Sequence, residues 1–289
     1  MRISTLGVHR STYLCLIALL LYIVSVAALS HARITHISKE LAVRLPLAAQ
    51  VALAGGDRYL AANMLGVRVL VVETFRMSPQ EFDIQARLQQ DVSWLNPAHQ
   101  DNYHIAAAIL SEPRLVPAAQ EILRRAADAR PYDWAPLFYY GFNRYHFERN
   151  PAAGAAALLE AVPRATDQQD RWALENLAAK WIERGYRSAE AARLVEGMAR
   201  SSPPGGFRRY LEVRAKRLRD LDELKGRAAE YQKRFGRKLE HIGDLVAAGL
   251  IPRVPVDPLG VGYVLDDAGE PVFGGPAAVG RNSVTNEGR

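Results

Sequence analysis

The stretch NPAHQDNYHIAAAILSEPRLVPAAQEILRRAADARP, residues 96–131, decides the fold because two helical patterns lie between two prolines. Residues 101–110 and 117–129 both carry apolar side chains at helical spacing. Prolines recur at intervals of 34 and 32 residues, at Pro97, Pro131 and Pro163. Small residues stand where two antiparallel helices would come close: Ala106, Ala107, Ala119 and Ala126. The repeat therefore predicts an all-α chain built of helix pairs.

The same pattern extends to both sides of this stretch. In the next unit we expect helices over 132–148 and 151–161, with Asn150 capping the second and Pro151 in its first turn. A Pro-Pro-Gly-Gly break follows at 203–206, so the predicted repeat region covers 57–201. The other helices expected in this region lie over 57–75, 79–95, 167–184 and 188–199, with Ser78 and Ser188 as caps.

These units resemble the tetratricopeptide repeat (TPR) family, in which helix–turn–helix units of about 34 residues end at a proline. The unit that begins at Pro131 supplies Trp134, Phe138, Gly141 and Phe142 for the aromatic and small positions of the family pattern, in a slightly different register. The resemblance implies a solenoid of helical hairpins whose concave face holds peptide or protein partners.

A basic helix and a compact C-terminal segment follow the repeats. Apolar residues recur at steps of three and four over 207–235 among many arginines and lysines, which predicts a long basic capping helix. In 236–273 we expect a helix over 239–248, a turn in which Asp257 accepts backbone N–H groups, and strands at YVLD and VF. This clasp resembles the C-terminal segment of certain bacterial membrane-anchored TPR proteins, and its DPxGxxY part is similar to turns in pseudopilins. The tail 274–289 is predicted to be disordered.

The N-terminus predicts a membrane anchor over 12–30. Its run of about twenty uncharged residues suits the thickness of a bilayer core, and the basic residues before it predict that residues 1–11 stay in the cytoplasm. A cleaved signal peptide has the same layout, with Ala28 or Ala32 before the cleavage site, and remains an alternative. Both readings place the bulk of the chain in the bacterial periplasm. An amphipathic lead-in, broken at Pro46, is expected over 31–56.

Composition and motifs favour a protein that is not an enzyme. The net charge of +6 permits an acidic partner or an anionic membrane but demands neither. The sequence shows no alternation of aromatic and basic residues that would stack nucleic-acid bases. It also contains no P-loop, no HExxH and no GxSxG motif. We therefore expect no catalytic residues, no cofactor, no nucleic acid and no small-molecule substrate.

The sequence gives no sign of a metal site either. The single cysteine, Cys15, lies in the apolar N-terminal run and has no second thiol to pair with. His99 and His104 are five residues apart and would point to different faces of a helix. The carboxylates at Asp266 and Asp267 miss the alternating oxygen pattern of a calcium loop. We expect no metal ion.

The stretch YDWAPLFYYGFNRYHFERN, residues 132–150, holds nine aromatic or imidazole side chains. Six of them fall in one helical arc of about 140°, which predicts an inner helix packed between two neighbours: Trp134, Phe138, Tyr139, Phe142, Tyr145 and His146. Gly141, at the edge of this arc, marks an expected close approach of another helix. Tyr140, Arg144 and Phe147 lie away from the arc, and tyrosine and arginine are enriched at binding hot spots. These three residues are the predicted partner-binding site.

The sequence therefore predicts a membrane-anchored, TPR-like scaffold or assembly factor for a cell-envelope complex, such as secretion, pilus or respiratory machinery. It would be a single-pass protein of the bacterial inner membrane. An alternative is an accessory subunit fixed in a large membrane complex, with a purely structural role. A third alternative is an enzyme whose site follows no known motif.

Overall fold

The computed structural model describes residues 5–31, 44–72 and 77–274, and within the first range the side chains of residues 13–27. These residues form twelve α-helices, one short 3-10 helix and a two-stranded sheet, which confirms the predicted all-α class. Part of the predicted lead-in, the end of the helix predicted over 57–75 and the tail beyond residue 274 lie outside the described residues.

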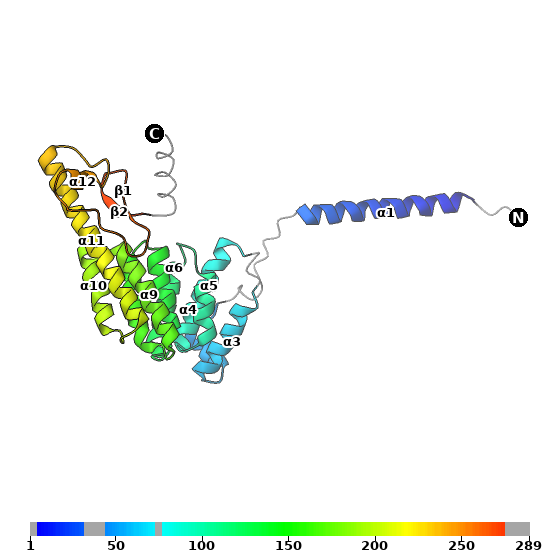
Figure 1. Ribbon diagram of the computed structural model, residues 1–289. Helices are drawn as coiled ribbons and strands as arrows, with labels where there is room; N and C mark the ends of the chain where they lie inside the picture. The colour runs from blue at the N-terminus through cyan, green and yellow to red at the C-terminus, as the bar shows by residue number, and fades with distance from the viewer. Residues whose placement is uncertain (1–4, 32–43, 73–76, 275–289) are drawn as a thin grey trace.

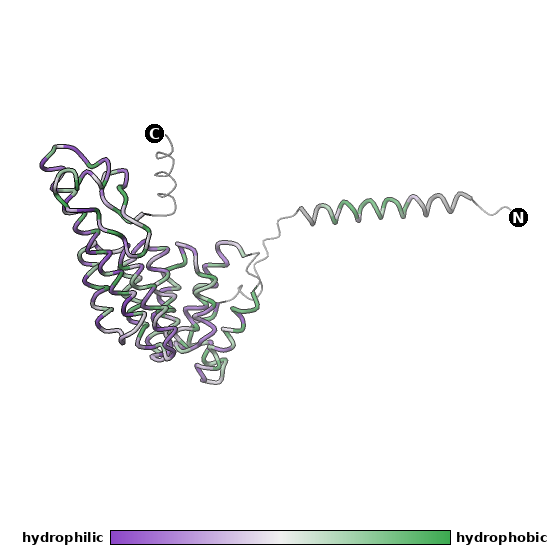
Figure 2. Tube along the Cα trace, viewed as in Figure 1, coloured by the Kyte–Doolittle hydropathy of each residue, from purple (hydrophilic) through white to green (hydrophobic). Residues whose placement is uncertain are grey.

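The first helix, α1 (Thr5–His31), lies apart from all the others (Figure 1). Its large apolar side chains from Tyr13 to Val26 are exposed, and the middle of the helix is mainly hydrophobic (Figure 2). In the described part of the chain, no helix combines the length and the apolar character needed to cross a membrane. The anchor over 12–30 stays a prediction.

The remaining helices pack against one another in chain order, from α3 at one end of an array to α11 at the other (Figure 1). In addition, α5 contacts α3 and α7, and α4 contacts α6. The bounds are α2 Leu47–Leu53, α3 Arg58–Leu70, α4 Pro79–Leu95, α5 Gln100–Ile109, α6 Val116–Ala129, α7 Ala135–His146, α8 Pro151–Ala161, η2 Val162–Arg164, α9 Gln168–Gly185, α10 Ser188–Ser201 and α11 Gly206–Phe235.

Local sequence signals account for most of these bounds. The Ser78 hydroxyl accepts a hydrogen bond from the Glu81 N–H, and the Glu81 carboxylate accepts one from the Ser78 N–H, so α4 begins with a capping box. The side chain of Asn150 caps α8 as predicted. The prediction for Ser188 was wrong. Because Arg187 is the last residue with an extended backbone, it holds the cap position, and Ser188 is the buried first residue of α10.

Helices α7 and α8 meet through Gly141 and Gly154. A β-carbon added to Gly141 would lie 2.9 Å from the carbonyl oxygen of Gly154, and one added to Gly154 would lie 2.9 Å from the carbonyl oxygen of Gly141. Only glycine at these two positions lets the backbones come so close. The close approach expected at Gly141 is confirmed, and it places that side of α7 against α8.

The C-terminal segment lies along α11 and consists of α12 (Asp244–Ala247), β1 (Tyr263–Leu265) and β2 (Pro271–Phe273). The two strands pair antiparallel, with Val264 opposite Val272, as the sequence predicted. The helix predicted over 239–248 was wrong in its first half.

The side chain of Asp244 explains why the first half of this predicted helix does not form. The Asp244 carboxylate accepts hydrogen bonds from the backbone N–H groups of Glu240 and His241, which holds this stretch in a turn. The apolar residues on either side, Leu239 and Ile242, are buried in a small core shared with α11. Their spacing was therefore compatible with a helix without requiring one.

Candidate partner-binding site

Two of the three residues predicted to bind a partner interact with each other along α7. The Arg144 guanidinium donates to the Tyr140 hydroxyl at 2.9 Å and to the Glu148 carboxylate at 2.6 Å. It also lies 5.3 Å from the centre of the Tyr140 ring. Tyr140 is half-buried against the core formed by α5 and α6. These contacts hold the Tyr140–Arg144 pair in place and engage part of its hydrogen-bonding capacity.

The third predicted residue, Phe147, belongs to a separate group of rings at the end of α7. Its ring meets the rings of His146 and Phe142 edge-on, at centroid distances of 4.8 and 6.4 Å. Phe142 and His146 stack face to face, 5.3 Å apart and 13° from parallel. The structure therefore brings Tyr140 and Arg144 together and places Phe147 in another cluster.

The arc of six rings predicted to be buried was wrong at its centre. Phe142 is 40% exposed, and His146 is exposed as well. Only the flanks of the arc pack: Trp134, Phe138 and Tyr145 on the core that α7 shares with α8 to α11, and Tyr139 on the core of α5 and α6. The reason is the Gly141–Gly154 contact. It places one side of α7 against α8, and the fully buried Leu137 lies on that inward side. The middle of the aromatic arc consequently faces outward.

A shallow cavity of about 270 Å³ adjoins the exposed rings. It is lined by Tyr145, His146, Arg149, Pro151 and Arg184. The Arg184 guanidinium, from α9, donates to the Tyr145 hydroxyl, and His146 belongs both to the cavity and to the ring stack. The rings and the arginines thus form one continuous surface. We call it the α7 ring surface and define it as Phe142, His146, Phe147, Arg149 and Arg184.

Sequence reasoning missed the two arginines of this surface. Arg184 comes from α9, and no periodicity connects it with α7. Arg149 has a φ of 54°, and in the described part of the chain it is the one residue other than glycine with a positive φ. A side chain held in this left-handed conformation costs free energy, and such positions cluster at ligand-binding sites. The Asn-Pro that follows Arg149 predicted only the start of α8.

A buried ionic cluster lies where α9 meets α11. Glu183 Oε1 is 2.6 Å from Arg214 Nη2, and Glu183 Oε2 is 3.9 Å from Arg217 Nη1. Arg214 also donates to the Tyr210 hydroxyl at 2.6 Å. Burial raises the pKa of Glu183, while the neighbouring arginines act to lower it, and the effect of burial is the larger.

The same cluster fastens the C-terminal segment to α11. Arg217 Nε lies 3.0 Å from Asp257 Oδ1, and its guanidinium lies 3.7 Å from the centre of the Phe273 ring. Asp257 also accepts hydrogen bonds from the N–H groups of Leu259 and Gly262, so its predicted role in the turn is confirmed. Because these buried charges form ion pairs with one another, we interpret the cluster as a structural contact that holds the C-terminal segment on α11.

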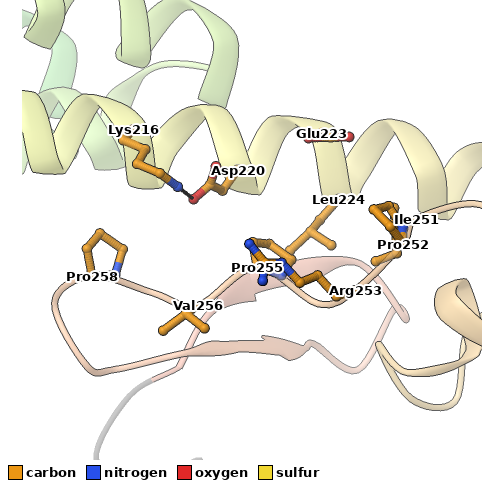
Figure 3. A pocket seen from close by; sticks show the side chains of 10 residues that line it. All are labelled: Lys216, Asp220, Glu223, Leu224, Ile251, Pro252, Arg253, Pro255, Val256 and Pro258. Carbon is orange, nitrogen blue, oxygen red and sulfur yellow. Dashed lines mark hydrogen bonds and ion pairs between the residues drawn. The ribbon is translucent and has the colours of Figure 1, made fainter.

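A larger open cleft of about 510 Å³ lies between α11 and residues 251–258 (Figure 3). On the α11 wall, Lys216 and Asp220 pair with each other at 2.6 Å. The opposite wall contains Pro252, Pro255 and Pro258, which have no N–H groups to donate. Glu223 and Arg253 also line the cleft, so it carries charged groups of both signs.

No family model, curated protein or solved structure matches the chain. The resemblance to the TPR family stays a prediction from the sequence pattern. In the part of the chain that the structure describes, no three His, Cys, Asp or Glu side chains gather so that they could hold a metal ion.

Proposed function

We propose that this chain is a membrane-anchored, TPR-like scaffold or assembly factor that holds a protein partner of a cell-envelope complex on the α7 ring surface. One observation carries the proposal. An exposed stack of two rings, Phe142 on His146, is continuous with a cavity that contains Arg149 and Arg184. Aromatic residues and arginine are the side chains most enriched in protein interfaces and at their hot spots.

The packing of the array supports the TPR-like part of the proposal. Helices contact their neighbours in the chain, and alternate helices contact each other in the rows α3, α5, α7 and α4, α6. Repeat proteins of this kind are held together mainly by contacts between neighbouring units. Together with the proline intervals in the sequence, this pattern favours a solenoid of helical hairpins over an irregular bundle.

The chemistry of the α7 ring surface indicates which partner it would hold. The stacked rings offer a flat apolar area, and an arginine can bind a carboxylate through two parallel hydrogen bonds. The partner would be a protein segment with an apolar or aromatic side chain beside a carboxylate. The predicted residues Tyr140 and Arg144 would line the edge of such a contact, while Phe147 would lie inside it.

The membrane part of the proposal places α1 in the bacterial inner membrane and the array in the periplasm. It is supported by the exposed apolar side chains of α1 from Tyr13 to Val26. Extraction of native membranes with carbonate should leave the protein in the pellet, and N-terminal sequencing should find the segment before residue 28 still attached. A soluble protein with a new N-terminus near Ala28 or Ala32 would contradict the anchor.

The partner-binding part is tested by affinity purification of the full chain from native membranes. The double variant Phe142→Ala/His146→Ala should retain at least about tenfold less of the partners than the wild type, because hot-spot truncations each cost ~1–2 kcal/mol or more. The triple variant Tyr140→Ala/Arg144→Ala/Phe147→Ala should also lose partner, to a smaller extent.

Tyr132→Ala is the matched control, because this tyrosine is 87% exposed and lies just before α7, outside the surface. The control should keep the partners. If Phe142→Ala/His146→Ala keeps them as well while its thermal unfolding is unchanged, the α7 ring surface is not the binding site. A partner that stays bound at fixed stoichiometry through detergent and high salt would instead favour the permanent accessory subunit.

A further inference from the structure

Helix α3, the first long helix of the array, carries apolar side chains on both of its sides. One side packs on α4 and buries Ala62, Leu65 and Val69. The other side is exposed: Leu60 by 47%, Met64 and Val67 each by 59%. Val71, at the end of the helix, is 62% exposed. At about 100° per residue these four exposed residues lie within an arc of about 60°. We call this stripe the α3 face.

The α3 face is larger than the scattered apolar residues that any soluble protein exposes. Three further apolar residues of α2 and α3 are each more than half exposed: Leu53, Tyr59 and Leu70. Contiguous exposed apolar patches of this kind mark contacts with another protein or with a membrane. The end helix of a stacked array normally carries a polar outer surface, because no further helix covers it.

Three arginines and one carboxylate lie within residues 44–72: Arg44, Arg58, Arg68 and Asp57. Arg44 pairs with Asp91, and Arg58 donates to the Leu95 carbonyl oxygen. Arg68 is therefore the arginine that flanks the α3 face at helical spacing. Asp57 caps the start of α3 by accepting hydrogen bonds from the N–H groups of Tyr59 and Leu60. An apolar stripe with arginine at its margin and tyrosine at its edge is the composition of helices that lie in a membrane interface.

The position of the α3 face in the chain points to the same contact. The apolar helix α1 ends at His31, and only 12 residues separate it from Arg44, where the described chain resumes. Twelve residues span at most ~43 Å even when fully extended. If α1 is in the bilayer, α2 and α3 are the first helices that the structure describes outside it, and the linker keeps Arg44 within ~43 Å of the end of α1.

We propose that the α3 face rests on the lipid bilayer, with its apolar side chains at the boundary between headgroups and acyl chains. This inference rests on the membrane part of the proposed function. The contact would hold the N-terminal end of the array flat on the membrane. It would leave the α7 ring surface and the basic α11 directed along or away from the membrane, where a periplasmic partner can reach them.

The experiment measures how deeply a label on the α3 face enters the lipid. The full chain is reconstituted in vesicles of zwitterionic and anionic lipid, with Cys15→Ala as the background. A bimane label is placed at Met64→Cys on the α3 face, and at Glu212→Cys, an exposed position of α11, as the matched control. Brominated lipids report contact with acyl chains, and aqueous iodide reports exposure to water.

The α3 face is expected to show quenching by brominated lipid at least about twofold stronger than the control, because interfacial helices enter the bilayer by 5–10 Å. The iodide quenching of residue 64 should be correspondingly weaker. With the label at Leu60→Cys, the added pair Met64→Glu/Val67→Glu should abolish the lipid quenching, and the pair Met64→Leu/Val67→Leu should preserve it.

Two outcomes would overturn the proposal. A label at residue 64 that iodide quenches as strongly as the control would show that the α3 face is in water. A label shielded from both quenchers would show that a protein surface, such as a second copy of the chain, covers it. A label on native Cys15 in the unsubstituted chain tests the anchor separately. Lipid quenching there with none at residue 64 would contradict the α3 contact and leave the anchor standing.

Discussion

The two ends of the helical array differ in what they leave exposed. At the N-terminal end, α3 buries one apolar side and exposes another, which includes Met64 and Val67. At the C-terminal end, α11 buries its leucines against the array and the C-terminal segment, and its other positions carry many arginines and lysines. Every stacked array has an end helix with one uncovered side. The described residues of this chain therefore cover the outer side of one end of the array and leave the α3 face at the other end exposed.

At the C-terminal end, buried ion pairs as well as apolar contacts hold the C-terminal segment on α11. Arg217 is buried between the Asp257 carboxylate and the Phe273 ring, and Arg214 is buried beside Glu183. Removing one partner of a buried ion pair leaves the other charge without compensation, which destabilises a protein strongly. This end should therefore respond sharply to single substitutions that the exposed α3 face would tolerate.

The largest effect is expected for Asp257→Ala. It removes the carboxylate that faces Arg217 and the acceptor for the N–H groups of Leu259 and Gly262. The unfolding free energy should fall by ~3–5 kcal/mol, measured by denaturant unfolding of the full chain in mild detergent. Asp267→Ala, an exposed aspartate of the neighbouring turn, is the control and should change it little. Equal values for the two variants would show that this contact contributes nothing to stability.

The next largest effect is a difference in unfolding free energy between substitutions of two adjacent residues on opposite sides of α3. Leu65 is 5% exposed and Met64 is 59% exposed. Leu65→Ala should lower the unfolding free energy by ~2–5 kcal/mol, because it leaves a cavity against α4. Met64→Ala should change it by no more than ~0.5 kcal/mol in the same detergent, as expected for an exposed position. A large loss for Met64→Ala would mean that another part of the chain covers the α3 face, and the contrast between the ends would disappear.

The smallest effect is a pH dependence at the C-terminal end. Burial raises the pKa of Glu183 above its ordinary value of 4.5, so the folded protein holds this proton more readily than the unfolded chain. The stability that protonation contributes is complete below pH 4.5 and is lost as the pH rises through the folded-state pKa. The unfolding free energy of the wild type should therefore fall relative to that of Glu183→Gln between pH 4 and pH 7.

This measurement also decides whether burial or the neighbouring arginines have the larger effect on the pKa of Glu183. Arg214, Arg217 and Arg184 all act to lower the pKa of Glu183. If the wild type instead gains stability relative to Glu183→Gln as the pH rises, the arginines outweigh burial and the direction given above is wrong. Glu230→Gln, on the exposed part of α11, is the control for the substitution itself.

Local interactions explain why much of the fold could be read from the sequence. Helices α4 (Pro79–Leu95) and α8 (Pro151–Ala161) have the predicted bounds, because their caps and first-turn prolines act over three or four residues. The β1–β2 pairing follows in the same manner from turn residues between two short apolar runs. The break before α11 and the basic character of that helix are likewise properties of adjacent residues.

Only the tertiary structure decided which surfaces are buried. The rings of α7 surround so much of the helix that their periodicity could not choose a side, and the Gly141–Gly154 contact turned Phe142 and His146 outward. The α3 face is apolar like a core, yet none of the described residues covers it. The Arg217–Asp257 pair joins residues 40 positions apart. Burial depends on what lies opposite a side chain, and for these residues the opposite element comes from a distant part of the chain.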